Sequence, residues 1–295
     1  MVPGKKVDCV IGFCSIRNFA DATEVLKQKV LVFVNQVGEI VHGCSDDYHG
    51  APNQNIGDSF LLVWRLSGLS WEKQMKLADM AIMSYIRIVA EINKSRVLAV
   101  YRGHPGLLQR IPQYRVQMGF GLHCGWAIEG AIGSEFKIDA SYLSPNVNVA
   151  SQLGTATKQF GVWLLISHFM VGLASPMMAK VCRVIDHVTL RGSKQPVRLY
   201  TIDLDLKLLE IQPKPAGPII RNRFKLRQIR EMRKTEKWSD DYTVCDAFKT
   251  DEDIIRMRTT FTPEFFQRFA TAYRNYEVGQ WNVARDLLFT CHYCP

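Results

Sequence analysis

The chain has 295 residues, of which 47% are hydrophobic and 22% charged, and its formal net charge is +9. This composition excludes a disordered or fibrous chain and suits one large globular domain or two smaller ones. The amino terminus lacks the apolar core of a signal peptide, and no apolar run has the length of a membrane span. We therefore expect an intracellular, cytoplasmic protein.

The eight cysteines show no disulfide spacing, so we expect reduced thiols in the core. Cys291 and Cys294 have the spacing of half a zinc site, but the sequence offers no second pair of ligands. We interpret them as incidental.

The first hundred residues alternate strand and helix patterns. Residues 7–16 form an apolar, β-branched run that predicts a buried strand. A capping sequence at Asp21 then starts a helical pattern that ends around residues 43–48. Two extended runs, 51–56 and 59–64, surround Gly57-Asp58 and predict a hairpin, after which Ser70 caps a second long helix.

The next hundred residues predict the remaining elements of one domain. We expect a strand over 116–128, a tight turn at 130–133, a helix over 145–160, a strand over 162–167, a short helix over 167–173 and a strand pair over 181–190 and 197–202. The order predicts a ferredoxin-like βαββαβ domain of the α+β class, an antiparallel sheet with helices packed on one face.

A linker and a tail follow this domain. Prolines at 213, 215 and 218 interrupt the pattern, and residues 207–237 carry ten Lys or Arg against three Glu. Aromatic residues at helical spacing between 265 and 287 resemble one unit of a helical repeat. We predict a domain at 5–203, a basic linker or helix at 204–240 and a mainly helical tail at 241–295. Such a unit cannot bury its own face, which indicates truncation or a covering partner.

Five motifs occur in an order that carries a family resemblance. They are Phe13-Cys-Ser-Ile-Arg-Asn-Phe19, Asn55-Ile-Gly-Asp58, Gly121-Leu-His-Cys-Gly125, Gly130-Ala-Ile-Gly133 and Asn146-Val-Asn-Val-Ala-Ser151. In this order they resemble the class III adenylyl/guanylyl cyclase domain, most closely that of unicellular eukaryotes. The resemblance implies conversion of ATP or GTP to a 3′,5′-cyclic monophosphate and pyrophosphate. It also implies two divalent ions, Mg²⁺ or Mn²⁺, and active sites at the interface of a head-to-tail dimer.

The metal and phosphate positions that this resemblance implies are only partly kept. Asp58 matches one metal-binding carboxylate, whereas Ser15 stands where the other is expected, and a neutral hydroxyl is a poor ligand for hard cations. We therefore expect weakened metal affinity. The backbone of the next four residues can still wrap phosphate oxygens. These residues are Ile16, Arg17, Asn18 and Phe19.

The catalytic and base-selecting positions are also altered. Asn148 matches the asparagine that orients the ribose, but Gln152 replaces the arginine that stabilises the transition state. Arg191 falls where the family has a triphosphate-binding lysine, although an exposed loop arginine is an equal alternative. Gln54 and Ser141 occupy the base-selecting positions with groups that both donate and accept, which leaves ATP and GTP open.

His123 lies in one of the motifs. We interpret it as a packed strand residue and not as a catalytic base.

Three hypotheses follow for function. The chain is a cyclase subunit that needs a complementary domain, in a homodimer or heterodimer; or a degenerate domain that binds nucleotide or a partner cyclase without turnover. Alternatively it is a basic adaptor that contacts anionic membranes or partner helices through residues 207–237 and the tail. We expect no binding to nucleic acid, because no aromatic stacking pattern accompanies the basic residues. In isolation we expect weak or no cyclase activity.

Overall fold

The computed structural model describes residues 3–192, 195–213 and 222–292. The chain divides into two compact units. The first contains the residues up to Ile202 together with Glu210–Asp246, and the second contains Asp203–Leu209 together with the residues from Ala247 onward.

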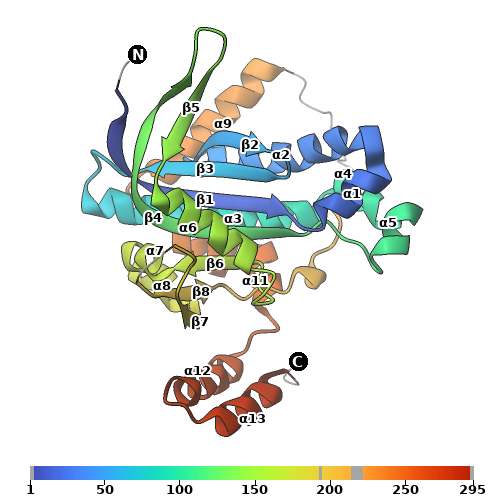
Figure 1. Ribbon diagram of the computed structural model, residues 1–295, viewed down its shortest axis with the longest axis vertical. Coiled ribbons are helices and arrows are strands. Elements are labelled where there is room, and N and C mark those ends of the chain that lie inside the picture. Colours follow the sequence, from blue (N-terminus) through green and yellow to red (C-terminus); the bar gives the residue numbers. More distant parts are fainter. Residues whose placement is uncertain (1–2, 193–194, 214–221, 293–295) are drawn as a thin grey trace. The chain divides into compact units, whose positions relative to one another are not determined.

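The first unit is built on an eight-stranded sheet, and its α+β class confirms the prediction (Figure 1). The strand order is β2-β3-β1-β4-β6-β8-β7, with β5 paired to β4. Only β4 and β6 run parallel, and the other pairs are antiparallel. The strands are β1 (Lys5–Ile16), β2 (Ala51–Ile56), β3 (Ser59–Arg65), β4 (Met118–Gly133), β5 (Ile138–Leu143), β6 (Leu164–Ser167), β7 (Arg183–Val188) and β8 (Val197–Thr201).

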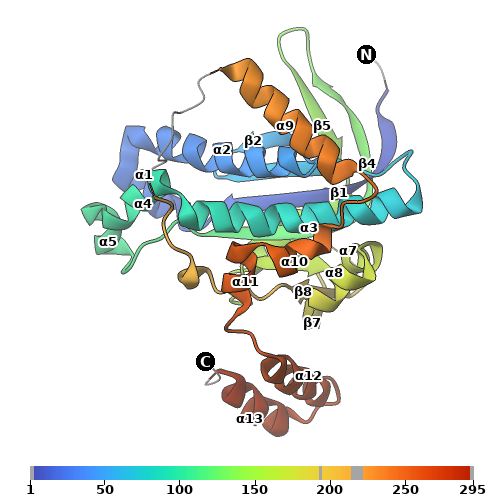
Figure 2. The same ribbon diagram turned by 180° about the vertical axis from the view of Figure 1, so that it is seen from behind.

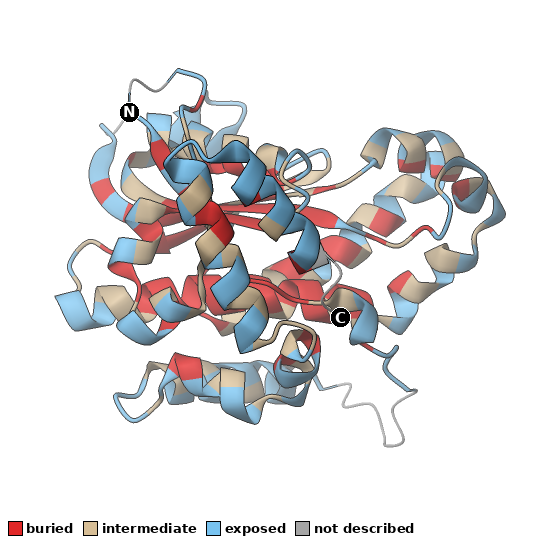
Figure 3. Ribbon diagram, turned by 90° about the horizontal axis from the view of Figure 1, so that it is seen from below, coloured by how far each residue is buried: buried red, intermediate tan, exposed pale blue. Residues whose placement is uncertain are grey.

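Helices pack on both faces of this sheet, whereas the sequence predicted them on one. Helices α2 (Val30–Asp47) and α3 (Trp71–Lys94) cover the face seen in Figure 2, and α6 (Pro145–Ala156) covers the opposite face, seen in Figure 1. The two-sided cover explains the apolar run of β1, in which successive buried residues point to opposite faces. Buried residues accordingly concentrate in the central strands and the inward sides of the helices (Figure 3).

The first predicted helix is in fact interrupted. It forms α1 (Phe19–Leu26), a 3₁₀ turn η1 (Lys27–Lys29) and then α2. Lys27 has a φ of 49°, in the left-handed region that L-residues seldom adopt. The chain therefore changes direction at a residue that carries no Gly or Pro signal.

Two other predictions near β4 are also corrected. The tight turn expected at 130–133 is wrong, because β4 continues to Gly133 and the chain reverses before β5. The pattern did not predict β5 as a strand. Most of its residues are exposed, since it pairs only with the far end of β4.

Several short helices fill the connections of the first unit. The helices that the sequence did not predict are α4 (Arg96–Ala99), η2 (Val100–Gly103), α5 (Pro105–Arg110), α8 (Pro176–Val181) and η4 (Val244–Asp246). The predicted short helix is present as α7 (His168–Leu173). Helix α9 (Arg223–Trp238) provides most of the basic segment and lies over α2 (Figure 2).

The second unit is helical. Its elements are η3 (Leu206–Leu208), α10 (Ala247–Thr250), α11 (Glu252–Arg258), α12 (Pro263–Glu277) and α13 (Trp281–His292). Helices α12 and α13 pack side by side and are joined through Gly279, whose φ is 82°. None of the described helices has the length and apolar character needed to cross a bilayer.

Candidate functional site

The β2–β3 hairpin and the end of β1 form the corner that contains Ser15 and Asp58. Ser15 lies opposite Ser59 in the β1–β3 ladder, and the Ile16 amide donates to the Asp58 carbonyl oxygen at 3.0 Å. Gly57, with a φ of 61°, gives the hairpin its turn. The Ser59 hydroxyl donates to Asp58 Oδ1 at 3.0 Å, which fixes the carboxylate. The structure thus brings the predicted metal-site residues together.

The loop after β1 leads directly into the first turn of α1. Asn18 adopts the left-handed conformation, with φ 55° and ψ 37°, and its carbonyl accepts from the Ala22 amide at 3.2 Å. Phe19 is the first residue of α1. The first amides of a helix have no partner within it, and the helix dipole favours an anion there. This geometry fits the expected wrapping of phosphate oxygens by backbone amides.

The Arg17 side chain, in contrast, points into the protein. Its Nη2 donates to the Val162 carbonyl oxygen at 2.6 Å, and its Nε is buried without a hydrogen-bond partner among the described residues. Burial lowers the pKa of this guanidinium from its ordinary value. Arg17 therefore anchors the loop to the segment before β6, and only its backbone faces the candidate phosphate site.

Glycines on one face of β4 allow α6 to lie close to the sheet. A Cβ atom at Gly121 would lie 2.2 Å from the Ala150 carbonyl oxygen, and one at Gly119 would lie 2.7 Å from that of Gly154. Both distances are far below contact distance, so only glycine fits. The glycine motif thus lets α6, the helix that carries Asn148 and Gln152, pack closely against β4.

His123 fixes the start of the same helix. Its Nε2 lies 3.1 Å from Asn146 Oδ1, and its Nδ1 lies 2.8 Å from the Ser167 hydroxyl. The Asn146 amide also donates to the Trp126 carbonyl oxygen at 2.9 Å. The imidazole is buried, and this burial lowers its pKa. The packed position predicted for His123 is what the structure shows.

Gln152 and Arg191 are neighbours. Gln152 Nε2 donates to the Arg191 carbonyl oxygen at 3.0 Å, which ties α6 to the loop between β7 and β8. Arg191 is exposed, and Asn148 is exposed one helical turn before Gln152. Gln152, which stands where an arginine is expected, therefore holds the loop that carries Arg191.

The two base-selecting residues also meet. Gln54 Nε2 on β2 donates to the Ser141 hydroxyl on β5 at 3.2 Å, and the adjacent Asn53 amide donates to the Ala140 carbonyl oxygen at 3.0 Å. The side chains form three groups: Ser15 with Asp58, Gln152 with Arg191, and Gln54 with Ser141. Among the described residues, no side-chain hydrogen bond or ion pair joins one group to another.

With this geometry in hand, comparison with known proteins identifies the family. The model of the adenylate and guanylate cyclase catalytic domain matches residues 2–203. The chain belongs to this cyclase family. The match covers the sheet, α6 and all three groups of candidate residues.

Two relatives are adenylate cyclases. The chain is 24% identical to one from Anabaena cylindrica over 193 residues and 26% identical to the terminal-differentiation specific one of Dictyostelium discoideum over 197 residues. The matches cover 64% and 65% of this chain, but only 36% and 8% of those proteins. The chain therefore spans only a fraction of the length of each of these relatives.

Solved structures show the same fold. A bacterial light-regulated adenylyl cyclase superposes with a TM-score of 0.55 at 22% identity, covering 81% of this chain and 60% of that one. The catalytic core of a rhodopsin-guanylyl cyclase with converted specificity, in complex with ATPαS, gives 0.52 at 17% identity, covering 68% and 97%. The cyclase fold is thus present despite low sequence identity.

The corner at Ser15 and Asp58 offers a neutral hydroxyl and one carboxylate, where the family resemblance implies two carboxylates. Among the described residues, no cluster of three or more His, Cys, Asp or Glu side chains could hold a metal ion. Mg²⁺ is commonly held by one or two carboxylates together with substrate phosphates. Asp58 and the Ser15 hydroxyl are therefore the side chains that would hold a divalent ion at this corner.

Two residues of the site were not predicted from the sequence. Ser59 orients the Asp58 carboxylate, and the Val162 carbonyl receives Arg17. The position of Ser59 directly after Asp58 was an available signal, whereas the contact with Val162 joins residues that are far apart in the chain.

Proposed function

We propose that this chain is a subunit of a nucleotide cyclase that binds a nucleoside triphosphate at a dimer interface and turns it over slowly or not at all by itself. The observation that carries the proposal is a preserved geometry with reduced charge. The fold holds the Asp58 carboxylate by the Ser59 hydroxyl, starts α1 directly after the predicted phosphate loop and packs α6 against β4, while Ser15 and Gln152 stand where the family resemblance implies two charged side chains.

A second cyclase domain completes the pocket in this proposal. Asp58 and the 16–19 loop come from one protomer, and Asn148, Gln152, Arg191 and the Gln54–Ser141 pair come from the other. The absence of side-chain hydrogen bonds and ion pairs between these groups within the described chain supports this division. The β4–β5 hairpin also carries apolar side chains without cover, since Phe136 is 89% and Ile138 70% exposed. We assign this hairpin to the dimer contact.

The residues of one protomer hold the triphosphate. Backbone amides at the start of α1 bind phosphate oxygens, and Asp58 with Ser15 orients the reacting end. A divalent ion held there would neutralise phosphate charge. Because the neutral Ser15 hydroxyl is a weaker ligand for a divalent cation than a carboxylate, less cation charge would be held over the α-phosphate, and bond formation between the 3′-oxygen and phosphorus would be slower.

The residues of the other protomer orient the sugar and meet the developing charge. Asn148 holds the ribose so that its 3′-oxygen faces the α-phosphorus as pyrophosphate leaves. Gln152 can donate a hydrogen bond but no charge, which costs on the order of 10²–10³ in rate relative to a well-placed charged donor. Arg191 supplies the remaining positive charge on the neighbouring loop, and its fork suits phosphate oxygens.

The base contact accepts either nucleotide. The Gln54 amide and the Ser141 hydroxyl each donate and accept, and their mutual hydrogen bond has to open to let a purine edge bind. A structural neighbour is a guanylate cyclase domain in complex with GTP, at a TM-score of 0.51 and 16% identity, and the neighbour with converted specificity holds ATPαS. We therefore propose binding of both ATP and GTP with little selectivity.

A binding and turnover measurement on the purified chain tests the proposal. We expect a labelled ATP or GTP to bind in the presence of Mn²⁺, and we expect binding to weaken in Asp58→Asn and Arg191→Ala. Arg96→Ala is the matched control, because Arg96 is an exposed cation outside the site. Turnover near the usual enzyme range of about 1–10³ s⁻¹ would contradict the slow site. Failure of both nucleotides to bind would contradict the pocket itself.

A further inference from the structure

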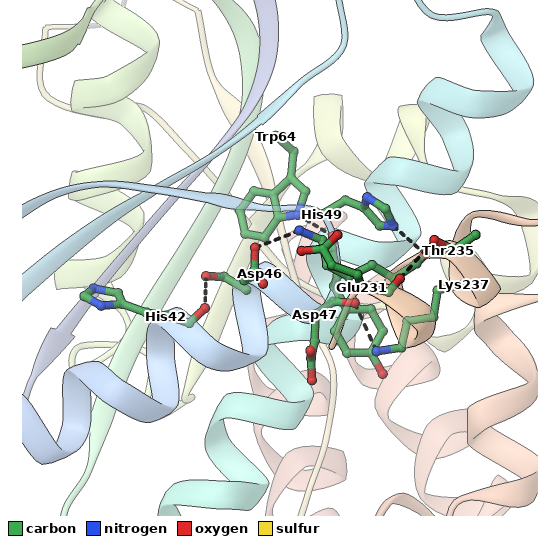
Figure 4. Close-up of polar contacts among 11 residues, drawn as sticks. His42, Asp46, Asp47, His49, Trp64, Glu231, Thr235 and Lys237 are labelled. Atoms are coloured by element: carbon green, nitrogen blue, oxygen red, sulfur yellow. Dashed lines mark hydrogen bonds and ion pairs between the residues drawn. The ribbon is translucent and has the colours of Figure 1, made fainter. Parts of the chain in front are cut away.

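Helix α9 is attached to the cyclase domain through its C-terminal half (Figure 4). Lys234 Nζ lies 2.8 Å from Asp46 Oδ1, and Lys237 Nζ donates to the Asp47 carbonyl oxygen at 3.0 Å. Lys237 also lies 4.1 Å from the centre of the Tyr48 ring. These contacts fasten the last turns of α9 to the C-terminal end of α2.

Three further contacts complete this attachment. His49 Nε2 lies 2.9 Å from the Lys234 carbonyl oxygen and therefore carries the proton. The His49 ring also packs on Trp238, with 4.9 Å between the ring centres. Beyond the end of the helix, Lys76 on α3 donates to the Ser239 carbonyl oxygen. The attachment gives α9 a fixed position on the domain.

The N-terminal half of α9 has no such attachment. Phe224 is 86% and Leu226 37% exposed, and Met232, two residues beyond this half, is 64% exposed. Lys225, Arg227 and Arg230 are exposed as well, and the described residues offer them no ion pair. The described part of the chain therefore leaves most side chains of this half exposed, large apolar ones included.

The charges of this half do not stabilise the helix itself. Residues 223–230 include four cations and no acidic residue, and Glu231 is the one acidic residue up to Arg233. Cations near a helix N-terminus are unfavourable, because the dipole places positive partial charge there. Apolar side chains exposed among cations are typical of helices that lie in the surface of an anionic membrane, where the apolar groups insert and the cations meet lipid phosphates.

We propose that the free half of α9 lies in the headgroup region of an anionic bilayer and holds the cyclase domain against the membrane. Two other occupants fit the surface less well. A second copy of α9 would bring like charges together. Nucleic acid would require a series of stacking rings, and this half carries one aromatic residue, Phe224. The inference is independent of the proposed nucleotide chemistry.

Co-sedimentation of the full chain with vesicles tests this inference. We expect binding to phosphatidylcholine vesicles with about one third phosphatidylserine, no binding to phosphatidylcholine alone, and weaker binding as salt rises. Lys225→Glu combined with Arg227→Glu should weaken binding about 25-fold or more, at about fivefold for each cation lost. Phe224→Glu combined with Met232→Glu should weaken it at least about tenfold, because insertion is lost.

A matched control distinguishes membrane binding by this helix from nonspecific binding by exposed apolar side chains. Leu31 on α2 is 70% exposed, so Leu31→Glu changes a similar apolar residue at another site and should leave binding unchanged. Amide exchange in 224–233 should slow on vesicles, which locates the contact, and circular dichroism verifies that the variants stay folded. Equal loss in Leu31→Glu would overturn the proposal, as would no preference for anionic vesicles or full binding by the Phe224/Met232 variant.

Discussion

Replacing Gly121 with alanine should displace α6 from its packed position against β4. The added Cβ would lie 2.2 Å from the Ala150 carbonyl oxygen and 2.4 Å from the Gly154 amide nitrogen, where ordinary contacts begin at 3.4 Å. Both neighbours are backbone atoms of α6, so no side chain can rotate away and the helix itself has to shift by roughly 1 Å. Such overpacking costs about 3 kcal/mol, the upper end of the usual range.

The same displacement should impair nucleotide binding and turnover, because Asn148 and Gln152 move with α6. A misplacement of about 1 Å can cost on the order of 10² in rate. Urea unfolding and titration with labelled ATP measure the two effects. Gly43→Ala is the matched control: Gly43 lies within α2 with open space around its Cα, so alanine should stabilise by about 0.5–1 kcal/mol. A loss below about 1 kcal/mol in Gly121→Ala would refute the packing argument.

Three further predictions concern stability. Gly57→Ala should cost about 1 kcal/mol because alanine is strained at a φ of 61°, and Gly57→Asn should cost less; equal losses in urea unfolding would argue against strain. Burial lowers the pKa of His123 in the folded chain, so as the pH falls the unfolded chain binds a proton at a higher pH than the folded chain does. The His123 contribution to the free energy of unfolding is therefore fully present above about pH 6.5 and is lost below it. His123→Gln should reduce this slope between pH 7 and 5, and an unchanged slope would assign it to other groups. Trp238→Ala should speed amide exchange in α9 and leave β1 unchanged, whereas unchanged exchange would show that Trp238 does not hold the helix.

Local patterns predicted the elements whose apolar faces are buried. The run in β1, the glycine turn before Asp58 and the serine cap of α3 all act through near neighbours, so the sequence indicates them directly. The break at Lys27 and the strand β5 were missed because no local pattern marks them. Lys27 is exposed and takes a backbone conformation that lysine does not favour, with no Gly or Pro to indicate it, and β5 depends on pairing with β4.

The candidate site residues show the same difference between features set by neighbours in the sequence and features set by distant contacts. Motifs led to the prediction of Asp58, Asn148 and the phosphate loop as site positions, because motifs are defined by neighbours in the chain. The bonds from Gln152 to Arg191 and from Gln54 to Ser141 join residues far apart in sequence, so no pattern predicted them. The inward turn of Arg17 depends on a carbonyl at Val162 and was likewise not visible.

Cyclic nucleotide production by Ser15→Asp combined with Gln152→Arg is the most direct test of the central claim, a folded cyclase pocket that lacks charge. One substitution restores a carboxylate beside Asp58, and the other restores a cation next to Arg191. With Mn²⁺ and ATP or GTP, the double variant should produce cyclic nucleotide at least about 100-fold faster than the unmodified chain, since one restored charge alone is worth on the order of 10²–10³. Equal rates in the two proteins, with nucleotide bound to both, would contradict the claim.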